Sequence, residues 1–117
     1  MCEYRLALVR VRGRQPGDSE FISDEYLSLF GKGSVPEPDP GRYPDPEELR
    51  RVLNRVHEHT LSELADLPDT ILDEPSEPRH PMFRTKLGAL GWCAQHEFLH
   101  AGQIGLLRRL LGSEPLR

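Results

Sequence analysis

At 117 residues, the chain has room for one domain and one hydrophobic core. Its 19 acidic and 15 basic residues give a net charge of −4, and no basic face is dense enough to follow nucleic-acid phosphates. Two cysteines are too few to staple a secreted fold, and no N-terminal apolar run is long enough for a signal peptide or a membrane span. The composition therefore predicts a single domain, residues 1–117, in the reducing cytoplasm, with neither nucleic acid nor a membrane as its partner.

The N-terminal block from Glu3 to Arg12 mixes apolar residues with three arginines. Its alternation fits a strand. However, no helix-start signal precedes it, and the apolar run begins at once, as if the chain entered an element already under way. A short helix is expected at about Ser23 to Phe30.

Proline divides the rest of the chain into blocks. Eight of the 11 prolines fall in two segments, residues 35–46 and 75–81, which cannot be helix interiors. They predict proline-rich loops at about residues 31–45 and 75–84.

A helix is predicted from about Pro46 to Asp66. Asp45 is its N-cap, Pro46 occupies the first helical position, and Glu48 lies three residues after the cap. Apolar residues recur at steps of three and four, as one buried helix face requires. Pro68 then prevents the helix from continuing.

The final helix is predicted to start at the N-cap Thr85 and to end at Leu111, where Gly112 provides a left-handed stop. Four glycines lie inside it, each costing about 1 kcal/mol relative to alanine. Three of them project to one side, which predicts that a second helix approaches closely there: Gly91, Gly102 and Gly105.

His96 and His100 are four residues apart, so on a helix both rings can reach one metal ion. The same stripe of the helix is largely apolar, and an unpartnered imidazole would be costly there. Two interpretations stay open: a metal pair, or core histidines satisfied by hydrogen bonds. Gln103 and Cys93, on the same stripe, are the candidates for residues around the ligands, although Gln103 fits a helix-packing amide equally well.

The string His96-Glu97-Phe98-Leu99-His100 also matches the H-E-x-x-H pattern of zinc proteases, in which the glutamate is the general base. The longer protease pattern is absent, because Gln103 and Leu106 replace its glycine and histidine. No sheet is expected before the helix to hold an extended substrate. A protease is therefore the least favoured alternative.

Residues 95–112, QHEFLHAGQIGLLRRLLG, resemble the last helix of the DinB-like family, also called the DinB/YfiT superfamily. The H-x-x-x-H-A-G-Q-I run carries the resemblance. Weaker similarity extends back through the Pro46 helix, where Thr60, Leu61 and Leu64 resemble the family's third helix, and to the loop containing Tyr26 and Phe30. The similarity covers essentially the whole chain.

The resemblance implies an all-α, up-and-down four-helix bundle, here lacking the first helix and part of the second. It also implies a divalent metal, zinc, nickel or iron, on three histidines. Two of these are His96 and His100, and the third would fall just upstream of Met1. The expected site is thus one ligand short in this chain.

Known members of the family include metal-dependent transferases that act on low-molecular-weight thiols. The resemblance therefore implies a metal-binding protein related to thiol S-transferases, with its activity in question because the first histidine is absent. The alternative is a non-catalytic helical bundle that acts in self-association. A homodimer is expected in either case, because a bundle lacking one helix exposes an apolar groove.

Overall fold

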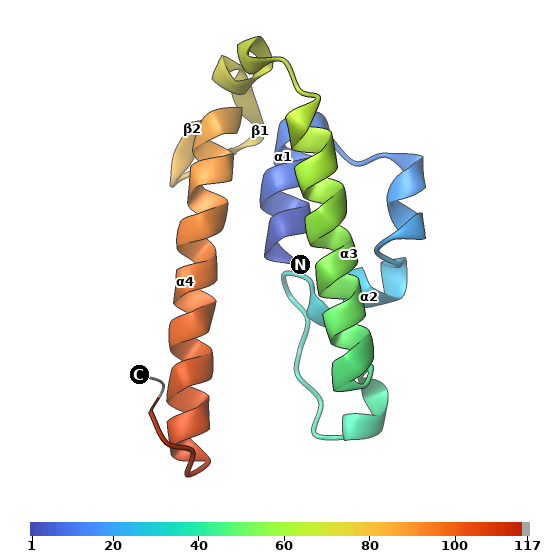
Figure 1. The fold of residues 1–117 in the computed structure, drawn as a ribbon, viewed down its shortest axis with the longest axis vertical. Helices are drawn as coiled ribbons and strands as arrows, with labels where there is room; N and C mark the ends of the chain where they lie inside the picture. Colours follow the sequence, from blue (N-terminus) through green and yellow to red (C-terminus); the bar gives the residue numbers. More distant parts are fainter. Residues whose placement is uncertain (116–117) are drawn as a thin grey trace.

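The computed structural model describes residues 1–115 and is mostly helical (Figure 1). An N-terminal helix spans residues 2–12, with π-helical hydrogen bonding in its middle and a short α-helical end. The elements in chain order are η1 (Tyr4–Val9), α1 (Arg10–Arg12), η2 (Pro16–Glu20), α2 (Asp24–Phe30), η3 (Pro40–Arg42), α3 (Pro46–Ala65), η4 (Asp69–Asp73), β1 (Pro75–His80), β2 (Phe83–Thr85) and α4 (Lys86–Leu110).

The N-terminal helix lies between α3 and α4 and contacts both (Figure 1). Tyr4, Leu8 and Val11 follow one another at helical spacing and are almost fully buried. The strand interpretation of this block is therefore wrong, because the same residues fit a helical period that buries one face. The helix ends at Gly13, whose φ of 83° favours glycine.

The predictions for the two long helices are confirmed to within a residue or two. The Asp45 carboxylate accepts a hydrogen bond from the Glu48 amide at 2.8 Å, which caps α3. Thr85 caps α4 in the same way, and Gly112 follows its end with a φ of 83°. α2 begins one residue after its N-cap Ser23, close to the expected position.

The core lies between the N-terminal helix, α3 and the segment before α2. Its buried members are Tyr4, Leu8, Phe21, Ile22, Val52 and Val56. The Arg12 guanidinium bridges two carboxylates, lying 2.9 Å from Asp18 and 2.8 Å from Glu63 of α3. The Tyr4 hydroxyl donates a hydrogen bond to the Asp18 carboxylate at 2.9 Å. This network joins three separate parts of the chain.

The prediction of a loop at 75–84 was wrong, as was the expectation that no sheet precedes the last helix. β1 and β2 form an antiparallel hairpin with an irregular register between Pro75 and His80. A two-stranded ribbon tolerates proline because both of its strands are edges. Residues 31–45 form a loop that contains only the turn η3.

The glycines of α4 are explained only in part. A Cβ at Gly88 would lie 2.9 Å from Cβ of Phe83, so the hairpin approaches α4 closely there. Gly91, Gly102 and Gly105 have nothing within 4 Å of such a Cβ among the described residues. The predicted second helix beside these three glycines is therefore not found in this part of the chain.

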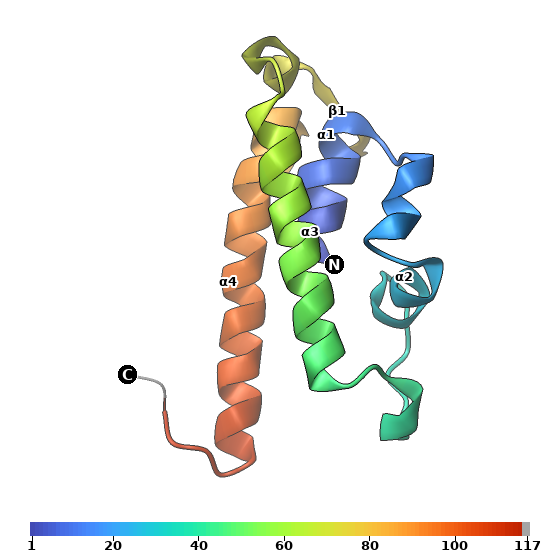
Figure 2. The same cartoon turned by 45° about the vertical axis from the view of Figure 1, so that its right-hand side comes forward.

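A mainly helical fold is thus confirmed, with a small hairpin added to the expected all-α class. The described residues do not form a complete four-helix bundle: three helical segments pack together, and α2 is short. The distal half of α4 extends past the N-terminal helix in both views (Figures 1 and 2). No helix within residues 1–115 is both long and apolar enough to cross a membrane.

Candidate metal centre

α4 presents His96 and His100 on one face, as their spacing predicts. Their ring centroids are 4.7 Å apart, and the rings are nearly perpendicular at 85°. Trp92 lies one turn earlier, with its ring centroid 6.0 Å from that of His96. The pair is thus arranged for two ligands to converge.

The N-terminal helix adds a third residue, Cys2, from the other end of the sequence. One ligand atom each from Cys2, His96 and His100 lies within 4.8 Å of the others. A tetrahedral zinc ion with bonds of about 2.0 to 2.3 Å holds its ligand atoms about 3.3 to 3.8 Å apart. Small side-chain rotations would therefore bring the three atoms onto one ion.

The imidazole nitrogens of the pair are in contrasting surroundings. Nδ1 of His96 is buried and has no hydrogen-bond partner among the described residues. An imidazole atom left unpaired in the interior is costly, and a metal ion would satisfy it. Nδ1 of His100 lies 2.9 Å from Oε1 of Gln103, which leaves Nε2 of His100 free for a metal. The three side chains therefore fit a divalent metal ion.

The cluster opens into a cleft of about 490 Å³ between the start of the N-terminal helix, the residues after α2, and α4. Trp92 and Phe30 are among its apolar lining residues, and Arg5, Arg10 and Lys32 are its cationic ones. Burial, followed by the nearby charges of Arg10 and Lys32, lowers the pKa of His80, which also lines the cleft. This metal cleft is therefore lined partly by apolar side chains and partly by positively charged ones.

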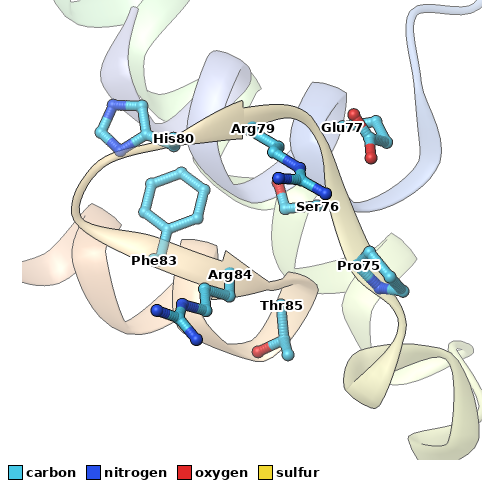
Figure 3. Close-up of a pocket in the computed structure, with 8 residues that line it drawn as sticks. All are labelled: Pro75, Ser76, Glu77, Arg79, His80, Phe83, Arg84 and Thr85. Carbon is cyan, nitrogen blue, oxygen red and sulfur yellow. The ribbon is translucent and has the colours of Figure 1, made fainter.

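A second cleft, of about 600 Å³, lies inside the β1–β2 hairpin (Figure 3). His80 lines both clefts. Its ring stacks on the Phe83 ring, with the two ring centroids 4.3 Å apart. The other polar side chains of the hairpin cleft include Ser76 and Thr85 (Figure 3). Thr85 already caps α4, and neither cysteine of the chain lines this cleft.

The family model of the DinB superfamily matches residues 3–104. This chain belongs to the DinB superfamily. Its members generally bind a divalent metal, which agrees with the chemistry of the Cys2, His96 and His100 side chains. No curated protein and no solved structure matches the chain.

Two residues of this DinB chain were predicted to lie around the metal ligands, Gln103 and Cys93, and only the first of them does so. Gln103 lies beside His100, as described above. Cys93 instead lies in the core at 7% exposure, and it does not line the metal cleft. Burial, followed by the charge of Glu97, raises the pKa of the Cys93 thiol to about 12. Cys93 therefore stays protonated and contributes packing to this helix face.

Glu97 is exposed, and it belongs neither to the cluster nor to the lining of the cleft. The carboxylate of a zinc protease has to face the metal-bound water, so this placement does not favour the H-E-x-x-H interpretation. The hairpin before α4 removes one of the two arguments made against a protease from sequence. The missing downstream histidine remains the other.

Sequence reasoning missed Cys2. No motif connects it to the histidines, because the residues lie at opposite ends of the chain and meet only through the packing of the N-terminal helix on α4. The sequence offered only a general indication of Cys2 as a ligand, namely that a cysteine and two histidines suit the same soft divalent metals.

Proposed function

We propose that this DinB chain binds a divalent metal ion through Cys2, His96 and His100 and is related to metal-dependent thiol S-transferases. The convergence of these three side chains within 4.8 Å is the observation that supports the proposal. The sequence provided only two ligands, and Cys2 supplies a third. Three protein ligands are typical of catalytic zinc sites.

The ligand chemistry favours zinc, with nickel and iron as the other candidates. A thiolate with two imidazoles suits all three ions, and one cysteine with two histidines gives zinc a familiar set of donors. When bound, such a metal keeps an open position and lowers the pKa of a thiol or water placed there. The protein's own residues orient and line the site: Gln103 holds the His100 ring, and Trp92 and Phe30 provide apolar surface in the cleft.

The proposal places the protein in the cytoplasm. A metal-binding Cys2 has to remain a thiol, and a reducing compartment keeps it so. Both cysteines are free among the described residues, and Cys2 is half-buried.

Cobalt substitution tests the site directly. Co²⁺ bound to Cys2 should produce a thiolate-to-metal charge-transfer band, which Cys2→Ser should abolish. His96→Ala and His100→Ala should each weaken binding at least tenfold, about 1.4 kcal/mol. Cys93→Ala is the matched control, because Cys93 lies outside the cluster. A charge-transfer band that survives Cys2→Ser would disprove the Cys2 assignment.

Catalysis requires a separate assay. The zinc-loaded protein should transfer a low-molecular-weight thiol to an electrophile, and His96→Ala should abolish the transfer. Metal binding without turnover across a panel of thiols and electrophiles would instead favour the second candidate function.

That second candidate is a non-catalytic bundle used in self-association. It is favoured by the apolar residues that the distal half of α4 exposes. Phe98 is 79% exposed and Leu110 is 74% exposed, and neighbouring leucines are similar. Soluble monomers seldom expose contiguous apolar surface beyond a few hundred Å².

A further inference from the structure

The metal cleft has an unbalanced charge. Three cationic side chains line it, Arg5, Arg10 and Lys32, and no aspartate or glutamate within residues 1–115 does so. Two acidic residues adjoin lining residues in sequence, and neither lines the cleft. The Glu3 carboxylate accepts a hydrogen bond from His57 of α3 at 2.8 Å, and Glu97 is exposed. The positive charge around the cleft is therefore not compensated from within its lining.

The three cations are held differently. Arg10 donates a hydrogen bond to the Pro78 carbonyl, and its guanidinium lies 5.7 Å from the centre of the Phe83 ring. Arg5 and Lys32 are exposed, and the structure describes no ion pair for either within residues 1–115. Arg10 thus has a structural role, whereas Arg5 and Lys32 are free to bind a ligand.

Apolar side chains make up another part of the cleft lining. Trp92 and Phe30 belong to it, and Leu6 adds aliphatic surface from the N-terminal helix. A volume of about 490 Å³ matches sites for small organic molecules, which combine apolar walls with a few polar groups that fix orientation. An uncharged ligand would leave the two cations without a role.

We propose that the metal cleft binds a small organic anion, whose carboxylate or phosphate group lies between Arg5 and Lys32 and whose apolar part packs on Trp92. This inference rests on the proposed function in one respect: it names the charge of the substrate that the metal site would act on. The anion contacts themselves involve none of the three metal ligands. Binding can therefore be measured on metal-free protein.

The fluorescence of Trp92 can report ligand binding, because it is the only tryptophan of the chain and it lines the cleft. Metal-free protein is titrated with benzoate, phenyl phosphate and benzamide, and Trp92 fluorescence is followed. Benzamide has the size and ring of benzoate but no charge. We expect at least one anion to bind tenfold or more tightly than benzamide, and the tighter of the two identifies the preferred head group.

The variant Arg5→Gln/Lys32→Gln should weaken anion binding at least tenfold, and added salt should weaken it in the parent protein. Arg50→Gln/Arg109→Gln removes the same charge from exposed positions outside the cleft and should leave the affinity unchanged. Because Arg5 and Lys32 are exposed, the variant should keep the circular dichroism spectrum of the parent.

Three results would overturn the proposal: equal affinities for benzoate, phenyl phosphate and benzamide; no saturable binding of any of them; or unchanged anion affinity in the cleft variant. The test is independent of the metal. Cys2→Ser should leave anion binding intact, so loss of cobalt binding with retained anion binding would contradict only the proposed metal site.

Discussion

Nδ1 of His100 donates a hydrogen bond to Oε1 of Gln103, 2.9 Å away and one turn further along α4. This contact places the ring proton on Nδ1 and leaves Nε2 free to bind a metal. Removing a hydrogen-bond partner of a metal ligand typically costs ten- to a hundredfold in affinity. We expect Gln103→Ala to weaken zinc binding about tenfold while the fold is retained, as measured by competition with a chelating dye. Gln95→Ala is the control, because Gln95 lies outside the cluster on the same helix. Equal losses in both variants would assign Gln103 to helix stability alone.

The two cysteines should differ sharply in reactivity. Cys2 is half-buried at the metal cleft, whereas Cys93 is in the core with its pKa raised to about 12, and the thiolate is the reactive form. In the folded protein at pH 8, an aromatic disulfide reagent should label Cys2 and leave Cys93 unmodified until the chain is denatured. Zinc should slow labelling of Cys2 at least tenfold. If the folded Cys2→Ser variant were labelled at the parent rate, Cys2 would not be the more reactive cysteine.

The Arg12 network should control stability in acid. Burial on its own would raise the pKa of Asp18, but hydrogen bonds from Arg12, the Gln15 amide and Tyr4 outweigh it and lower the pKa. The hydrogen bond from Arg12 also lowers the pKa of Glu63. A lowered carboxyl pKa stabilises the fold above the unfolded value, near 4, and this stability is lost as the pH falls through the folded value.

Urea unfolding at several pH values measures this effect. The free energy of unfolding should decrease below about pH 4 in the parent, and Asp18→Asn should make that decrease shallower. At pH 7, Arg12→Met should cost about 3 to 5 kcal/mol, because it leaves Asp18 buried without its charge partner. An Arg12→Met variant as stable as the parent would show that the network contributes little.

Self-association should occur through the distal half of α4. Leu106 and Leu110 are 59% and 74% exposed there, beside glycines with open space around them. We expect the chain to sediment as a dimer and Leu106→Glu/Leu110→Glu to dissociate at least tenfold more readily. Leu61→Glu changes a leucine of α3 that is 56% exposed and should have no effect. A parent protein that stays monomeric across a concentration series would rule out this interface.

The long helices could be predicted because their ends are encoded locally. Each of these signals acts within one turn of the helix end that it marks. The structure has Asp45 and Pro46 at the start of α3, Thr85 at the start of α4 and Gly112 just after its end, as expected. The N-terminal helix could not be distinguished from a strand, because its short apolar run fits both periods. Contact with α3 and α4, which no local pattern encodes, settles it as a helix.

The candidate site could likewise be predicted from the sequence only in part. His96, His100 and Gln103 belong to one helix, so their relative positions follow from helical geometry alone. Cys2 depends on tertiary packing, as does the separation of Cys93 from the cleft. The hairpin was missed because its prolines conceal the strand pattern, although a cross-strand pair joins His80 to Phe83.

The proposed metal site brings together Cys2 and His96, which are far apart in the sequence. A metal held there would act as a reversible cross-link that closes residues 2–96 into a loop. A covalent link around a loop of about 100 residues is worth roughly 4 to 5 kcal/mol in lost unfolded-state entropy. Metal supply would then govern whether this small domain persists in the cell, since the apo chain would unfold more often and be more exposed to proteases.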